Sequence, residues 1–179
     1  TAVANILRAK FRLGLFDKPY TQADELPSIA DDAALEMAKE MALQSIVMLK
    51  NDHRALPLSK SELTSLAVIG PLAAAPHQPL GTWIFDGEPP LSVTGLDAMR
   101  MLVGDDVNLR YLRAMETSRS KDAAPFEEAV ELANDSDAAV LFLGEEAILS
   151  GEAHSRADIS LPGAQAELVA RIRETGKPV

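Results

Sequence analysis

The chain has 179 residues, 47% of them hydrophobic, a formal net charge of −10 and a pI of about 4.7. This length and apolar content suffice to bury a core of ordinary size, as one domain or as one domain plus a tail. The acidic balance argues against a nucleic-acid partner, the absence of cysteine excludes disulfides and thiolate metal sites, and the longest apolar runs fall far short of the roughly 20 residues that span a bilayer.

Apolar residues at helical spacing predict a first helix over residues 2–13, which Gly14 would end. The polar stretch that follows, up to Ser28, contains two prolines and is typical of a linker. A second helix is predicted over residues 32–49, because its apolar residues keep one face and acidic residues stand at its start, where they complement the helix dipole.

Short apolar runs and helical patterns alternate in the rest of the chain. Runs at 66–69, 107–112 and 138–143 predict three strands, the last being typical of a strand covered on both faces. Helices are predicted over 92–103, 126–133 and 162–173. Strands separated by helices in repeated order imply βαβ units, so the predicted fold class is α/β, with a mainly parallel sheet flanked by helices.

Two details of these helices are also predicted. Ser92 is expected to be the N-cap of the first of the three. The last is expected to be entered through Pro162 and to bury the row Ala164, Leu168 and Ile172.

The third predicted strand is followed by a dense group of ionisable residues. Gly144 ends the strand, and within fourteen positions come Glu145, Glu146, Glu152, His154, Arg156 and Asp158. Such a density of charge cannot be buried unpaired. It lies beyond the carboxyl end of a strand, where open α/β sheets usually bind their ligands. This stretch therefore predicts half of an active site.

Five segments of the chain, in this order, resemble glycoside hydrolase family three, the β-glucosidase group, and are most similar to its bacterial periplasmic β-glucosidases. The segments are LRAKFRLGLFDKPY, AKEMALQSIVMLKNDHRALPL, LAVIGPLA, LGTW and FLGEEAILSGEAHSRADISLPGAQAELV. The resemblance covers essentially the whole chain.

The resemblance implies a division of labour between two domains. In that family a (β/α)8 barrel carries the nucleophile, an Asp, and a following α/β sandwich domain supplies the general acid/base, a Glu. By this mapping, residues 1–16 are the last helix of the barrel domain, residues 17–30 are the linker, and residues 31–179 are an α/β sandwich domain truncated at its C-terminal end. The nucleophile would lie outside this chain, in the upstream barrel domain.

Glu152, in the segment SGEAHSR, occupies the position of the family's acid/base when LFLGEE and ISLPG are used as anchors. A glycoside's leaving oxygen needs a proton as its bond breaks, and in a retaining enzyme the two carboxyl groups stand roughly 5–5.5 Å apart. The alternative is that Glu152 is a solvated loop residue.

Other residues are candidates for substrate binding or for ordering the loop. Glu145 could bind a sugar hydroxyl or pair with Arg156, and Arg156 could fix the loop through Glu145 or Asp158. His154 could be a base or a loop-ordering residue, and Trp83 could stack on a sugar or serve packing. Glu146 is expected to be structural. The spacings of Glu145, Glu152, His154 and Asp158 match no metal-ligand pattern, so neither a metal nor a cofactor is expected.

The sequence and the resemblance together predict part of a retaining, exo-acting β-glucosidase that hydrolyses terminal β-D-glucosyl residues of a β-glucoside or oligosaccharide. The resemblance also implies a periplasmic or secreted location, and the chain alone is expected to be inactive. The alternative is a non-catalytic carbohydrate-binding or interaction domain of the same fold. A nucleotide-binding domain is disfavoured, because no Gly-rich phosphate loop is present.

Overall fold

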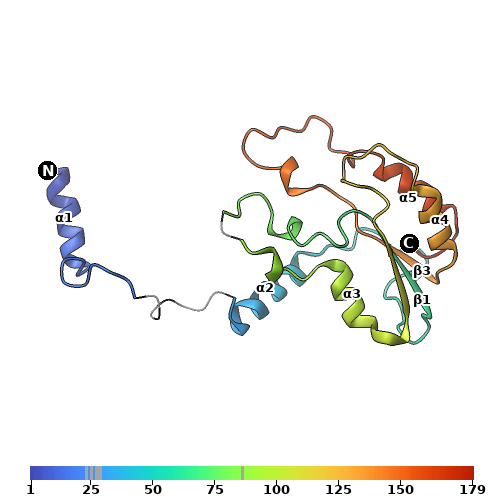
Figure 1. The fold of residues 1–179 in the computed structure, drawn as a ribbon, viewed down its shortest axis with the longest axis horizontal. Coiled ribbons are helices and arrows are strands. Elements are labelled where there is room, and N and C mark those ends of the chain that lie inside the picture. Colours follow the sequence, from blue (N-terminus) through green and yellow to red (C-terminus); the bar gives the residue numbers. More distant parts are fainter. Residues whose placement is uncertain (23, 25, 27–29, 86) are drawn as a thin grey trace. The chain divides into compact units, whose positions relative to one another are not determined.

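The computed structural model describes the whole chain except residues 23, 25, 27–29 and 86 (Figure 1). The chain divides into two compact units, residues 1–50 and residues 51–179. Residues 23, 25 and 27–29 of the predicted linker lie outside the described residues. The division at residues 16 and 30 therefore stays a prediction.

The first unit contains helices α1 (Ala2–Arg12) and α2 (Asp32–Ser45). Gly14 follows α1 with φ +70, as expected of the residue that ends a helix, and Asp31 caps α2 by accepting a hydrogen bond from the Ala34 amide at 2.8 Å. The prediction that the second helix continues to residue 49 was wrong. Ile46 is already extended, with ψ 124, because consecutive β-branched residues at 46 and 47 disfavour the helix.

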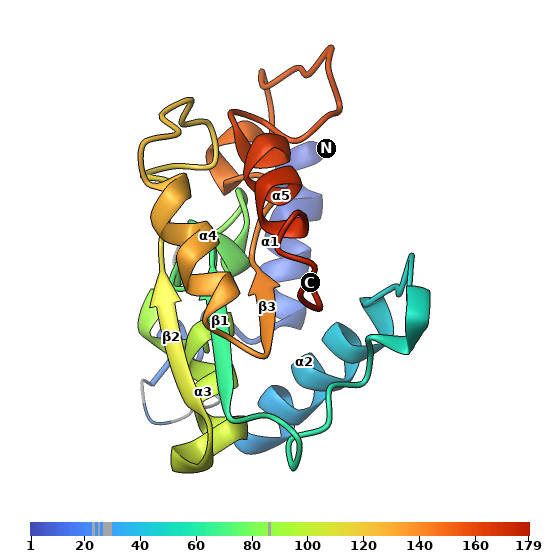
Figure 2. The ribbon, with the colours of Figure 1, turned by 90° about the vertical axis from the view of Figure 1, so that its right-hand side faces the viewer.

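The second unit is built on a parallel sheet of three strands, β1 (Ser65–Ile69), β2 (Asn108–Leu112) and β3 (Ala138–Leu141), in the order β2-β1-β3. Figure 2 shows β1 between β2 and β3. This confirms the predicted α/β fold. The predicted third strand was two residues too long, since β3 ends at Leu141, and Gly144 then turns the chain away with φ +145.

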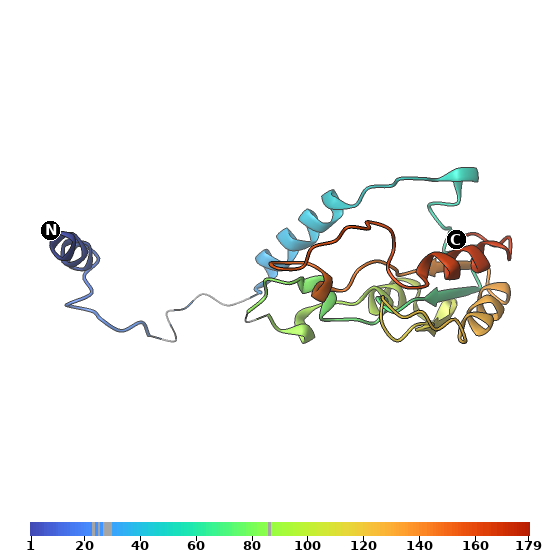
Figure 3. The same cartoon turned by 90° about the horizontal axis from the view of Figure 1, so that it is seen from above.

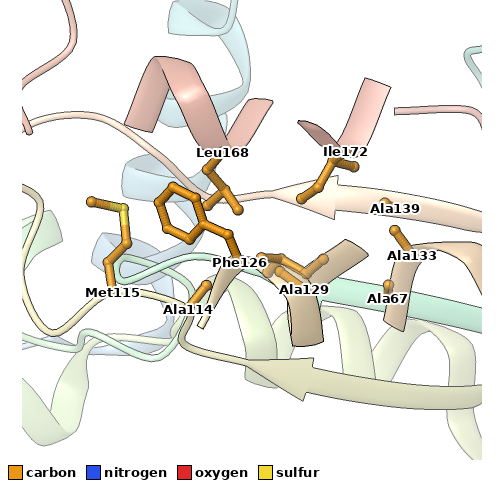
Figure 4. Close-up of a cluster of buried hydrophobic side chains, with 10 residues drawn as sticks. Ala67, Ala114, Met115, Phe126, Ala129, Ala133, Ala139, Leu168 and Ile172 are labelled. Carbon is orange, nitrogen blue, oxygen red and sulfur yellow. The ribbon is translucent and has the colours of Figure 1, made fainter. Parts of the chain in front are cut away.

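Helices cover both faces of this sheet. Along β1, Leu66 and Val68 face helix α3 (Gly95–Val103), whereas Ala67 and Ile69 face helices α4 (Phe126–Asn134) and α5 (Gln165–Arg173), as the alternation of side chains in a strand requires. In the cluster beneath α4 and α5, four of the buried contact residues are alanines from the sheet and α4 (Figure 4): Ala67, Ala129, Ala133 and Ala139. Because these side chains are small, α4 packs close to the strands.

Two helix starts differ from the prediction. The N-cap of α3 is Thr94 and not Ser92, because the Thr94 hydroxyl accepts from the Asp97 amide at 3.1 Å and donates to the Asp97 carboxylate at 2.6 Å. Helix α5 begins at Gln165 and not at residue 162, because Gly163 has φ +65, outside the helical region. Within its predicted row, Leu168 and Ile172 are fully buried and Ala164 is partly buried.

The strand order reverses at β1. The chain passes from β1 through α3 to β2 on one side, and then through α4 to β3 on the other side. The loops that follow β1 (residues 70–94, the β1–α3 loop) and β3 (residues 142–164, the β3–α5 loop) therefore leave neighbouring strands at the same edge. Gly70 permits their close approach, since an added Cβ there would lie 2.3 Å from the Phe142 carbonyl oxygen. Such a reversal point is where α/β sheets bind ligands.

Among the residues that the structure describes, no helix has both the length and the apolar character required to cross a membrane.

At the opposite edge of the sheet, Asp137 ties β1 to β3. One carboxylate oxygen accepts hydrogen bonds from the Thr64 amide (2.7 Å), the Thr64 hydroxyl (2.8 Å) and the Ser65 amide (2.9 Å). These donors, Thr64 foremost, lower the pKa of Asp137 from 3.8 to about 2. A carboxylate with a lowered folded-state pKa stabilises the fold above its unfolded pKa, and this contribution is lost as the pH falls through the folded value.

We expect Asp137→Asn to lower the urea midpoint of unfolding at pH 7. The difference from wild type should shrink as the pH falls from 3.8 toward 2, because the wild-type carboxylate then protonates and resembles the amide. Urea titrations at pH 7, 5, 4 and 3 measure this, with Asp105→Asn, at an exposed position, as the control. A difference that stays constant over this range would show that the charge of Asp137 contributes nothing.

Candidate active site

The β3–α5 loop, which carries most of the predicted site residues, is held at both ends by Gln165. This side chain is fully buried. Its carbonyl oxygen accepts from the Gly144 amide at 2.8 Å. Its amide nitrogen donates to the carbonyl oxygens of Gly144 (2.8 Å), Ser118 (2.8 Å) and Pro162 (3.0 Å). The two N–H bonds are thus shared among three acceptors, and the start and the end of the loop are fixed to one side chain.

Glu146 fastens the beginning of the loop to the neighbouring loop after β2 (residues 113–125, the β2–α4 loop). One of its carboxylate oxygens accepts from the Ser118 hydroxyl at 2.8 Å and from the Ser118 amide at 3.2 Å. Arg119 adds an ion pair with an Nε–oxygen distance of 3.4 Å. Glu146 therefore has structural contacts, as expected from the sequence.

The β1–α3 loop supports the first half of the β3–α5 loop, and Figure 3 shows the two running side by side. Gln78 accepts a hydrogen bond from the Ala147 amide at 2.7 Å, and the Thr82 hydroxyl donates to the Ala147 carbonyl at 2.7 Å. The contact is close, since a Cβ added to Gly151 would lie 2.5 Å from Cγ2 of Thr82. Gly151 itself has φ +108, a conformation that favours glycine.

Glu152 stands in a tight turn immediately after this contact. The His154 amide donates to the Gly151 carbonyl at 3.2 Å, and Ala153 has φ +64, the left-handed conformation that a type II turn requires at its third residue. His154 also donates from Nδ1 to the backbone carbonyl of Glu152 at 2.9 Å. The side chain of Glu152 is exposed. The turn thus presents the carboxyl group to solvent while its backbone is fixed.

Arg156 connects the beginning and the end of the β3–α5 loop. Its guanidinium forms an ion pair with Glu145 and donates to the carbonyl oxygens of Asp158 (2.8 Å) and Ser160 (3.2 Å). The charge of Glu145 is therefore compensated by Arg156.

Asp158 caps the following turn. Its carboxylate accepts from the Ser160 hydroxyl at 2.6 Å and from the Ser160 amide at 2.8 Å. These two bonds, with a smaller contribution from Arg156, hold the pKa of Asp158 below its usual value. The contacts of Asp158 and Arg156 order the last part of the loop.

Trp83 lies beside the turn that carries Glu152. A Cβ added to Gly151 would be 3.7 Å from Cζ2 of the indole ring, yet 62% of Trp83 is exposed. An exposed aromatic face next to a carboxylic acid is suited to stacking against the apolar face of a sugar. The structure thus brings Trp83 to the segment that contains Glu152, although the two residues are 69 positions apart in the chain.

Four supporting residues were not found from the sequence: Gln78, Thr82, Ser118 and Gln165. The sequence does contain a signal for Gln165, because its spacing places it in the same buried row of α5 as Leu168 and Ile172. A polar residue in an apolar row needs partners to be buried. In the described part of the chain, no three His, Cys, Asp or Glu side chains are grouped so that they could hold a metal ion.

Known proteins match this chain over nearly its full length. The family model of the glycosyl hydrolase family 3 C-terminal domain matches residues 46–179. A β-xylosidase of Formosa agariphila is 43% identical over 99% of this chain and 25% of its own, and a periplasmic β-glucosidase of Salmonella typhimurium is 31% identical over 99% and 26%. The structure of a β-glucosidase from Listeria innocua in complex with gluconolactone matches with a TM-score of 0.82 at 33% identity, over 99% of this chain and 24% of that one. The chain spans about a quarter of the length of the curated relatives it matches.

We expect Thr82→Val to loosen the β3–α5 loop without unfolding the domain. The lost hydroxyl bond to the Ala147 carbonyl is worth about 1 kcal/mol, which corresponds to about a fivefold larger population of the opened loop. Limited trypsinolysis after Arg156 measures that population. Thr82→Ser, which keeps the hydroxyl, is the matched control and should be cleaved at the wild-type rate. Equal cleavage of all three proteins would mean that this bond does not hold the loop.

Proposed function

This chain belongs to glycosyl hydrolase family 3, and on that basis we propose that it is part of a retaining, exo-acting β-glycosidase whose general acid/base is Glu152. The observation that carries the proposal is the exposed carboxyl group of Glu152, held in a fixed turn at the reversal point of the sheet. The nucleophile, an Asp, would belong to a barrel domain of the same protein outside this chain.

In the first step Glu152 gives its proton to the glycosidic oxygen. The bond between that oxygen and the anomeric carbon breaks as the nucleophile attacks the same carbon, so the aglycone leaves with the proton and a glycosyl-enzyme remains. In the second step the carboxylate of Glu152 takes a proton from water. The water oxygen attacks the anomeric carbon, the nucleophile is released, and Glu152 is again an acid.

The charges around Glu152 suit this alternation. A guanidinium bound to Glu152 would favour its carboxylate form and oppose its role as an acid. Arg156 is instead engaged by Glu145 and by two carbonyl oxygens. We therefore assign Glu145, Arg156 and His154 to ordering the loop, and Trp83 to stacking against the substrate beside Glu152.

The proposed substrate is a β-glucoside or oligosaccharide with a terminal β-D-glucosyl residue. A terminal β-D-xylosyl residue is the second candidate, because the relative with 43% identity is a β-xylosidase. Hydrolysis of p-nitrophenyl β-D-glucoside and p-nitrophenyl β-D-xyloside by the full-length protein separates the two. The periplasmic β-glucosidase among the relatives supports a periplasmic or secreted location.

Glu152→Ala in the full-length enzyme should lower kcat/KM for cellobiose, or for the matching xyloside, about 10²–10⁴-fold, the usual contribution of a general acid. An aryl glycoside with a good leaving group needs little protonation, so its kcat/KM should change far less. Its kcat should still fall, since the second step lacks a base. Added azide should raise that kcat, because azide attacks the glycosyl-enzyme without giving up a proton.

Glu128→Ala, an exposed carboxylate on α4, is the control and should behave as wild type on both substrates. If Glu152→Ala also leaves both rates near wild type, Glu152 is not the acid. The non-catalytic carbohydrate-binding domain then becomes the better interpretation of this chain.

The 179-residue chain alone is expected to hydrolyse neither aryl glycoside, because the proposed nucleophile is outside it. Circular dichroism should first establish that the isolated chain is folded, so that inactivity has one cause. Turnover by the folded chain that disappears in its Glu152→Ala variant would contradict the proposal that the nucleophile lies elsewhere.

A further inference from the structure

We propose that Gln165 is a positioning residue for Glu152, acting through the base of the loop that carries it. This inference rests on the proposed function of Glu152. The hydrogen bonds of the Gln165 side chain go to residues other than Glu152 and Trp83. Its side-chain bonds go to Gly144, Ser118 and Pro162, which belong to the start of the β3–α5 loop, the β2–α4 loop and the end of the β3–α5 loop.

The burial of Gln165 makes these bonds obligatory. The side chain is fully buried in the row of α5 that also contains Leu168 and Ile172. An amide in that place loses its hydration and must be satisfied by protein groups. Both of its polar atoms are satisfied, and three of its four bonds are 2.8 Å long. An apolar residue would fill the same space, so packing alone does not require an amide here.

The hydrogen bonds of Gln165 restrain the β3–α5 loop. Gly144 and Pro162 enclose residues 145–161, with Glu152 near the middle. Holding both ends at one side chain restricts the conformations of the whole segment between them. Without the amide, the two ends of the segment would no longer be held by one side chain. The segment, and Glu152 within it, would then sample more conformations.

A second link connects Gln165 to the segment just before Glu152. The Ser118 carbonyl accepts from Gln165, while the Ser118 amide and hydroxyl donate to Glu146. Glu146 precedes the short helix η6 (Ala147–Leu149), which leads directly to Gly151 and Glu152. The route from the buried amide to the turn of Glu152 thus runs from Gln165 to Ser118, from Ser118 to the Glu146 carboxylate, and then along the chain through η6.

A role in positioning and a role in stability alone predict different kinetics. A residue that only stabilises the fold changes the amount of active enzyme and so affects all substrates by the same factor. A residue that positions the acid affects the protonation of the leaving group. Its loss therefore harms substrates with poor leaving groups much more than those with good ones.

The test compares Gln165→Met with Leu168→Ala in the full-length enzyme. Methionine has a similar length and no amide, whereas Leu168→Ala disturbs the core on the same helix and leaves the loop bonds in place. The measurements are the thermal midpoint and kcat/KM for two glycosides of the same sugar, one with a p-nitrophenyl and one with a sugar leaving group. For Gln165→Met we expect about a 10²-fold loss with the poor leaving group, the effect of roughly 1 Å of misplacement, and a loss of only a few fold with the good one.

Leu168→Ala should lower the thermal midpoint but keep the wild-type ratio between the two substrates. The inference is overturned if Gln165→Met also keeps that ratio while Glu152→Ala changes it, and the proposed function then still stands. If Glu152→Ala leaves the ratio of kcat/KM between the two substrates unchanged, both the proposed function and this inference are wrong. Should Gln165→Met not fold, Ser118→Ala tests the same route. It removes only the hydroxyl bond to Glu146 and should shift the ratio several-fold in the same direction, whereas an unchanged ratio would overturn the inference.

Discussion

The pairing of β1 with a parallel neighbour on each side is the constraint on which the rest of the second unit depends. Parallel strands require crossover connections, and two neighbours on opposite sides require the chain to leave β1 first in one direction and later in the other. The two crossovers pass over opposite faces, so α3 lies on one side of the sheet and α4 on the other. The same reversal places the β1–α3 and β3–α5 loops next to each other, and this neighbourhood makes a site possible there.

The charged stretch after β3 is ordered by hydrogen bonds and ion pairs, and different residues hold different parts of it. Gln165 holds the two ends, Glu146 and Thr82 attach the first half to neighbouring loops, and Arg156 and Asp158 order the second half. Glu152 lies near the middle of the restrained segment, and its side chain is exposed. A proton donor must be fixed in place yet open to its substrate, and the proposed role of Glu152 requires that combination.

Periodicity and turn residues were enough to predict the α/β class, the three strands and five helices with small errors at their ends. The errors have local causes, such as Thr94 taking the cap that Ser92 was expected to provide, and Gly163 delaying α5. The partners of the loop could not be predicted in this way. Gln78 and Thr82 meet the β3–α5 loop only because strand order brings two distant segments together, and no pattern near either residue records that contact. The burial of Gln165 could have been predicted, because it shares the spacing of an apolar row, and a buried polar side chain requires a hydrogen-bond partner.

The alanines between α4 and the sheet also limit how this domain can be engineered (Figure 4). Ala67, Ala129 and Ala133 are fully buried, and the closeness of helix and strands depends on their size. Larger side chains there would force the layers apart, at a typical cost of 1–3 kcal/mol. The displaced helix would carry the β2–α4 loop with it, and Ser118 in that loop contacts both Gln165 and Glu146. Programmes that seek thermostability should therefore leave this layer untouched and choose substitutions on the exposed surfaces of the helices.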